Sequence, residues 1–251
     1  MMCPKKVNRV KAGVISYKMM QKIMLLILLT FLALAISSSA FAAKGEKTLK
    51  LSVLVNPQSQ THLFGTKETK STDLSAFTKW TSMLKRYQDQ MTTVKAATFR
   101  GWFSRFAYLK DKPLSVKLRQ INNIVNLNRY VPDDRGYGKS DHWATPLEFL
   151  EKRYGDCEDF AITKFMALKA LGVSESKMRI AVVQDTQKNI AHAVLVVVDQ
   201  GRSYMLDNQI QDVVDTTRVA HYKPYYSISS NAWWLHKDTG SKTAMLESAS
   251  Q

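Results

Sequence analysis

A change of hydrophobic pattern at Gly172 is the sequence feature that most limits the fold of this chain. Before Gly172, apolar residues recur at the spacing of helices, and two or three helices are expected between about residues 73 and 130. After it, β-rich runs extend from Met178 to Gln184, Ile190 to Val198 and Arg202 to Leu206. The run from Ile190 to Val198 is apolar on both faces, as expected of a central strand. Helices followed by strands indicate an α+β domain, with N-terminal helices packed on an antiparallel sheet.

Two helix signals stand shortly before this change of pattern. Thr145 and Glu148 form a capping box with a proline at the first helical position, which predicts a short helix to about Tyr154. Gly155 is expected to end that helix. The apolar spacing then predicts a second helix that begins at Cys157 and stops at the next glycine. Cys157 is therefore expected at a helix N-terminus.

The first 42 residues have the composition of an export signal. They carry basic residues and no acid, followed by an apolar run from Ile23 to Ile36 and a small-residue stretch that ends at Ala42. The apolar run is shorter than the roughly 20 residues that span a bilayer, so a membrane anchor is the weaker alternative. We expect a signal peptide, residues 1–42, that is cleaved after Ala42.

Part of the charge of the chain belongs to this leader. The whole sequence has a formal net charge of +15, and the leader holds six of its 36 basic residues and none of its 21 acidic ones. The remaining +9 is scattered, with no long basic run and no interleaving of basic and aromatic residues. Nucleic acid is therefore not expected as a partner.

The length and pattern of the chain indicate one core domain. Residues 43–73 are polar and mixed, and they are predicted to form a loosely attached N-terminal arm in which Leu49 to Val55 is a strand candidate. The domain is placed at residues 74–236, and residues 237–251 are a polar tail. Within the domain, the turn-rich segment Pro132 to Gly138 is expected to be a loop.

Cys157 is the single cysteine that remains once the leader is removed. An exported chain with one cysteine cannot form an internal disulfide, so the thiol needs another role. His192 and then Asp207 follow it along the chain. Such a set can supply a thiol nucleophile, a base that takes its proton and a carboxylate that orients the base. A helix N-terminus also favours the thiolate form of a cysteine.

The register of a hairpin decides whether His192 and Asp207 can meet. If the hairpin turns at Gln200 and Gly201, Asp207 faces Val194 on the neighbouring strand. His192 lies on the same face as Val194, because side chains alternate along a strand. The two residues then become diagonal neighbours, with β-carbons about 7 Å apart. A three-residue turn would place them on opposite faces, unless a bulge intervened.

Acidic neighbours of the thiol complicate this interpretation. Nearby carboxylates disfavour a second anion, so a positive charge must offset them if the thiolate is to form. Each signal alone also has an ordinary structural explanation. A free cysteine can be a small buried hydrophobe, a histidine in an apolar strand a satisfied core residue, and an aspartate the end of a strand. Acids in a first helical turn compensate the helix dipole, and here they are Asp156, Glu158 and Asp159.

Taken together, these motifs resemble a known family. The matching segments run from Trp143 to Leu150, Gly155 to Ala161, Ala191 to Leu195 and Leu206 to Asn208. They are similar to segments of the bacterial transglutaminase-like cysteine proteinases, and the resemblance covers about residues 74–236. It implies a papain-like or transglutaminase-like α+β core with the nucleophile at a helix N-terminus.

The same resemblance implies the role of each site residue. Cys157 is expected to be the nucleophile, His192 the general base and acid, and Asp207 the orienting carboxylate. It also implies calcium dependence. Because calcium takes six to eight oxygen ligands, backbone carbonyls, water and Asp141 are expected to complete its shell, and its charge would offset the acids beside the thiol. The acids expected to hold the ion are Asp156, Glu158 and Asp159.

The resemblance further implies a location and two partners. Family members of this type are periplasmic enzymes that cut a large cell-surface adhesin near its N-terminus at a di-alanine site, which releases biofilm cells. An inner-membrane receptor for cyclic di-GMP inhibits them. Two other functions remain open for this chain: transfer of the acyl group to an amine, and a catalytically silent binding module of the same fold.

Overall fold

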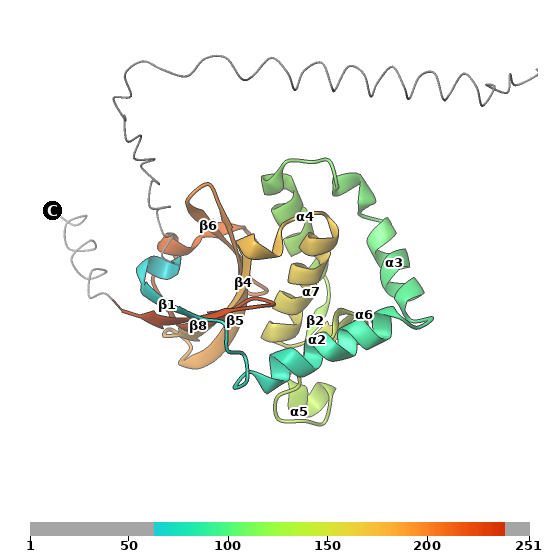
Figure 1. Cartoon of the computed structure of the whole chain (residues 1–251), viewed down its shortest axis with the longest axis horizontal. Coiled ribbons are helices and arrows are strands. Elements are labelled where there is room, and N and C mark those ends of the chain that lie inside the picture. The colour runs from blue at the N-terminus through green and yellow to red at the C-terminus, as the bar shows by residue number, and fades with distance from the viewer. Residues whose placement is uncertain (1–62, 239–251) are drawn as a thin grey trace, which may run out of the picture. The chain divides into compact units, whose positions relative to one another are not determined.

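The computed structural model of this chain describes residues 63–238. The expected signal peptide and the strand candidate Leu49 to Val55 lie outside the described residues, as does most of the polar tail. The main sheet has seven strands. Figure 1 shows the helices gathered on one side of this sheet, so the α+β class predicted from the sequence is confirmed. Within residues 63–238, no helix combines the length and the apolar character needed to cross a membrane.

Three helices occupy the region where the periodicity predicts two or three. The segment predicted as a loop at Pro132 to Gly138 differs from expectation, because Pro132 caps a short helix whose first turn carries two acids. Short 3₁₀ turns lie at Leu63–Gly65, Ala107–Leu109, Glu175–Lys177 and Thr216–Arg218. The helices are α2 (Thr78–Met91), α3 (Ala96–Ser104), α4 (Leu114–Asn126), α5 (Asp133–Gly136), α6 (Pro146–Lys152) and α7 (Cys157–Ala170).

Helix α6 begins as predicted and ends for a different reason. The hydroxyl of Thr145 accepts a hydrogen bond from the backbone N–H of Glu148, and the Glu148 carboxylate accepts one from the N–H of Thr145. Arg153, in the left-handed conformation with φ of 59°, caps the C-terminus. Gly155 instead allows close packing, because a β-carbon there would clash with the side chain of Asp159. It lies in β3 (Tyr154–Gly155), which pairs in parallel with β2 (Arg129–Tyr130).

The seven strands of the main sheet pair antiparallel throughout. The three predicted runs correspond to β4, β5 and β6. Strand β5 is the fifth strand in the order and is buried on both faces over most of its length, which confirms it as a central strand. The order across the sheet is β1 (Lys67–Ser71), β9 (Trp233–Lys237), β8 (Tyr222–Ile228), β4 (Met178–Asp185), β5 (Ile190–Asp199), β6 (Arg202–Leu206) and β7 (Val214–Asp215).

The segment that precedes residue 74 belongs to the fold from Leu63 onward. Leu63 and Phe64 are fully buried, and Lys67–Ser71 forms the edge strand β1. The guanidinium of Arg179 forms an ion pair with Glu68 of β1 at 2.7 Å. These contacts differ from the expected loosely attached arm. The polar sequence of β1 suits an edge strand, because such a strand has only one neighbour and an exposed flank.

A hydrophobic core lies on each face of the sheet. Ala193, Leu195 and Val197 of β5 join the core shared with the helices, whereas Val194 and Val196 join the core on the opposite face. Helix α7 is buried along almost its whole length and packs against β5. The N-terminus of α7 is therefore fixed relative to the strand that carries His192.

Candidate active site

Cys157 is the first residue of α7, as predicted, and its side chain is partly buried. The fully buried carboxylate of Asp159 holds this end of the helix in place. It accepts hydrogen bonds from the backbone N–H of Ala144 at 2.7 Å and of Asp156 at 3.4 Å. The segment that leads into α6 is thereby tied to the residue that precedes the cysteine.

The hairpin between β5 and β6 has the predicted register. Gln200 and Gly201 form the turn with φ of 49° and 76°, and Asp199 pairs with Arg202. His192 Nε2 and Asp207 Oδ1 lie 2.8 Å apart. The two residues are 2% and 1% exposed, so this pair is shielded from solvent.

Two further residues, Tyr222 and Gln209, contact this pair and were not identified from the sequence. The hydroxyl of Tyr222 donates to Asp207 Oδ2 at 2.8 Å. The backbone N–H of Gln209 donates to Asp207 Oδ1 at 2.9 Å, and its side-chain nitrogen lies 3.2 Å from His192 Nδ1. Burial works to raise the pKa of Asp207, but the hydrogen bonds from His192, Gln209 and Tyr222 hold it below its ordinary value.

The sulfur of Cys157 lies where α7 meets β5. The backbone N–H of Ala193, the residue after His192, is close enough to lower the pKa of the thiol. Burial and the Glu158 carboxylate, whose Oε2 lies 3.1 Å from the sulfur, have the larger and opposite effect. The net result is a pKa well above the ordinary value. In the polypeptide alone, burial and the neighbouring acids thus outweigh the hydrogen bond from Ala193.

Acidic side chains form a cluster beside the thiol. Ligand oxygens of Asp133, Asp141 and Glu158 lie within 4.8 Å of one another, and those of Asp133, Asp156 and Asp159 do so as well. Asp133 belongs to both groups, although the sequence did not identify it as a ligand. Asp141, expected to complete the shell, is in the first group and also pairs with Lys79.

The state of these carboxylates fits a bound cation. Oδ1 of Asp133 and Oδ1 of Asp156 are buried and have no hydrogen-bond partner in the described part of the chain. Burial together with the neighbouring Glu158 and Asp159 raises the pKa of Asp156 to about 10. A set made only of carboxylate oxygens suits a hard divalent ion such as calcium. The residues present therefore fit the expected metal.

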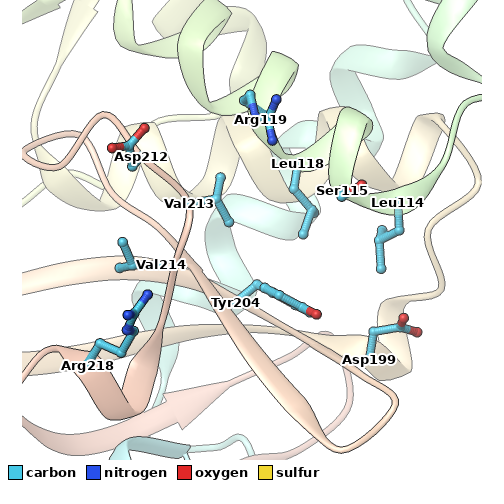
Figure 2. A pocket seen from close by; sticks show the side chains of 10 residues that line it. All are labelled: Leu114, Ser115, Leu118, Arg119, Asp199, Tyr204, Asp212, Val213, Val214 and Arg218. Atoms are coloured by element: carbon cyan, nitrogen blue, oxygen red, sulfur yellow. The ribbon is translucent and has the colours of Figure 1, made fainter.

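A separate cavity of about 690 Å³ opens at the other end of the hairpin (Figure 2). None of its lining residues belongs to the cysteine, histidine or carboxylate groups described above, so it is distinct from the candidate active site. Its walls come from the start of α4, the β5–β6 hairpin and the segment around β7. They are formed by Leu114, Ser115, Leu118, Arg119, Asp199, Tyr204, Asp212, Val213, Val214 and Arg218.

Comparison with known proteins defines the class of this protein. The profile of the bacterial transglutaminase-like cysteine proteinase family, BTLCP, matches residues 78–239, which is more than half of the chain. The chain therefore belongs to this family of cysteine proteinases, and its fold is transglutaminase-like.

Solved structures of LapG are similar to this chain. LapG of Legionella pneumophila is 30% identical, and the match covers 65% of this chain and 90% of that chain with a TM-score of 0.51. Calcium-bound LapG of the same organism is 26% identical, and that match covers 66% and 98% with a TM-score of 0.51. No curated protein matches this chain.

Proposed function

We propose that this protein is a periplasmic, calcium-dependent cysteine endopeptidase that cleaves a large surface adhesin near its N-terminus, under the control of an inner-membrane receptor for cyclic di-GMP. The observation that carries the proposal is the buried His192–Asp207 pair, in which His192 lies on the strand against which the Cys157 helix packs. Membership of a cysteine proteinase family and the likeness to LapG support it. The adhesin, the receptor and the location follow from the resemblance of the sequence motifs.

In this proposal, the three residues act in sequence on a peptide bond. Cys157 attacks the carbonyl carbon, and its proton passes to His192. His192 gives that proton to the leaving amine as the carbon–nitrogen bond breaks, and then activates the water that hydrolyses the thioester. Asp207 accepts the hydrogen bond that orients the imidazole. The backbone N–H of Cys157, at the start of α7, is the expected donor to the oxyanion.

The acidic cluster is proposed to hold calcium. The ion would supply positive charge beside a thiol that the carboxylates otherwise keep protonated. A calcium-bound structure of LapG supports this assignment. The residues that would hold the ion are Asp133, Asp141, Asp156, Glu158 and Asp159.

Incubation of the mature protein with an N-terminal adhesin fragment and a labelled amine tests the proposed reaction. We expect two unlabelled fragments, formed more slowly when the periplasmic domain of the receptor is added. An adhesin fragment whose di-alanine pair is replaced serves as the control and should stay intact. Incorporation of the label would instead show acyl transfer to an amine. If calcium is present and neither cleavage nor labelling occurs, the assignment as an enzyme is contradicted.

The hydroxyl of Tyr222 provides a test of the orienting carboxylate. Tyr222→Phe removes one hydrogen bond to Asp207, so we expect kcat/KM to fall about three- to tenfold. The pKa of Asp207 should rise with the loss of this donor, which moves the acidic limb of the pH–rate profile to higher pH. Tyr225→Phe is the matched control, because the exposed Tyr225 hydroxyl bonds Gln184 on the sheet surface. Equal effects in both variants would argue against a role for Tyr222.

A further inference from the structure

The side chain of Gln209 covers one face of the His192 ring. Its amide nitrogen lies 3.2 Å from Nδ1 and 3.3 Å from Nε2 of the imidazole. A nitrogen in the ring plane at these nearly equal distances would overlap the carbon that lies between the two ring nitrogens. The amide therefore lies over the face of the ring and is not in line with the lone pair of either nitrogen.

Gln209 lies on the solvent side of this ring. The other contacts of the imidazole come from the interior: Asp207 bonds Nε2, and the ring of Tyr222 lies 5.5 Å away between centroids. Both of these residues are 1% exposed, whereas Gln209 is exposed. His192 is nevertheless only 2% exposed. The side chain of Gln209 thus separates the imidazole from bulk water.

A lysine from another segment fixes the direction in which this amide faces. The ammonium group of Lys188, in the turn between β4 and β5, donates a hydrogen bond to Oε1 of Gln209. Because an ammonium group can only donate, the amide oxygen must face Lys188 and the amide nitrogen must face the ring. The turn is itself held by Asp185, whose Oδ1 accepts from the backbone N–H of Lys188 at 3.1 Å. The donor end of Gln209 is thereby directed at His192.

Helix α4 holds the backbone of the same segment. Asn126 donates to the backbone oxygen of Asp207, and Asn122 to that of Gln211, both at 2.8 Å. The two asparagines lie one turn apart on α4. The backbone N–H of Gln209 donates to Asp207 Oδ1 at 2.9 Å. Gln209 is therefore fixed at its backbone and at the end of its side chain, although such order in an exposed glutamine costs side-chain entropy.

This arrangement leaves accessible the ring nitrogen that the proposed reaction needs. Asp207 Oδ1 lies 2.8 Å from Nε2, so Nε2 carries a proton and Nδ1 is the acceptor for the proton of Cys157. An amide over the face restricts tilting of the imidazole without occupying the Nδ1 lone pair in the ring plane. It also keeps water away from the hydrogen bond between Nε2 and Asp207.

We propose that Gln209 is a positioning residue, whose amide, held by Lys188, keeps the His192 ring in its orientation and shields the bond with Asp207 from water. The inference rests on the proposed function, because it assigns Gln209 to the same three residues. Water that reached Nε2 would compete with Asp207 for its proton and allow the ring to turn. Since Gln209 acts through His192, its loss should lower kcat and leave KM nearly unchanged.

Gln209→Ala tests the proposal, with Gln211→Ala as the matched control. Gln211 is exposed in the same segment, and it contacts α4 through its backbone oxygen, which the substitution retains. In the mature Cys157→Ala protein, ¹H NMR follows the exchange of the His192 Nε2 proton with water. We expect exchange to be about tenfold faster or more in Gln209→Ala and unchanged in Gln211→Ala. This measurement needs no activity, so it decides the role of Gln209 even if adhesin cleavage proves to be the wrong reaction.

Lys188→Met is a second variant that leaves Gln209 in place. Lys188 is exposed, so its replacement should not disturb the fold. It frees the amide oxygen of Gln209, and exchange of the Nε2 proton should therefore become faster, by a smaller factor than in Gln209→Ala. Unchanged exchange in both variants would overturn the proposal, as would an equal increase in Gln211→Ala.

Steady-state kinetics separate positioning from substrate binding. In the active protein, Gln209→Ala should lower kcat about three- to tenfold with nearly unchanged KM. The melting temperature should stay within a few degrees of the original, because the side chain is exposed. A raised KM with the original kcat would overturn the proposal, because it assigns Gln209 to contact with the substrate. A lowered melting temperature with the original exchange rate would do so as well, because it assigns the glutamine to the fold alone.

Discussion

Cys157→Ala is expected to reduce kcat/KM for adhesin cleavage by about 10⁴-fold or more. The reason is that the variant has no nucleophile, because Cys157 is the single thiol of the chain once residues 1–42 are removed. The partly buried site loses one sulfur atom and the hydrogen bond that the thiol donates to Glu158, so the melting temperature should change by only a few degrees. Cleavage is measured by fragment formation over time, and stability by thermal unfolding.

Cys157→Ser is the matched control for this experiment. It keeps a hydroxyl at the same position, but this group is much less acidic than a thiol, so activity should remain strongly reduced. Proteolysis at the original rate in either folded variant would remove Cys157 from the mechanism and leave the chain as a binding module.

Removal of calcium is expected to have the second largest effect on the rate of cleavage. EGTA should abolish cleavage, and added calcium should restore it, because the thiol otherwise remains among uncompensated carboxylates. The melting temperature should also rise with calcium, since an ion that binds only the folded state stabilises it. Full activity in EGTA would rule out the metal requirement.

Asp133→Asn tests whether the acidic cluster binds calcium through particular carboxylates or acts only through its overall negative charge. It should raise the calcium concentration needed for half-maximal activity by about tenfold or more, because Asp133 lies in both groups of clustered oxygens. Asp134→Asn is the matched control: Asp134 is the exposed neighbour in α5 and is in neither group. The calcium-dependent rise in melting temperature provides a second readout that needs no catalysis. Equal effects of the two substitutions would contradict a specific role for Asp133.

Local chemistry explains which elements could be predicted from the sequence. The capping box at Thr145, the start of α7 and the Gln200–Gly201 turn each depend on neighbouring residues, and all three occur as predicted. Strand β1 was missed because an edge strand needs no apolar face. Strand β8 was missed because its buried and exposed residues do not alternate regularly and a proline interrupts it.

The residues of the candidate site also fall into two groups: those that neighbouring residues predict, and those that the packing of the whole domain brings in. The hairpin register brings His192 to Asp207, and this could be derived from the turn alone. Tyr222 reaches Asp207 from β8, whose position relative to the hairpin depends on the packing of the whole domain. Asp133 reaches the cluster because β2 pairs with β3, a contact between segments far apart in the chain. No local pattern marks Tyr222 or Asp133.

The pairing of β2 with β3 has a consequence for the topology of the chain. It holds Asp133, after β2, beside Asp156, after β3, with α5 and α6 in between. An ion shared by these carboxylates would close that segment into a loop, much as a disulfide does, and would reduce the entropy of the unfolded chain. A mature protein with one cysteine has no disulfide available for this purpose. Its acids would provide a cross-link that calcium levels can make or remove.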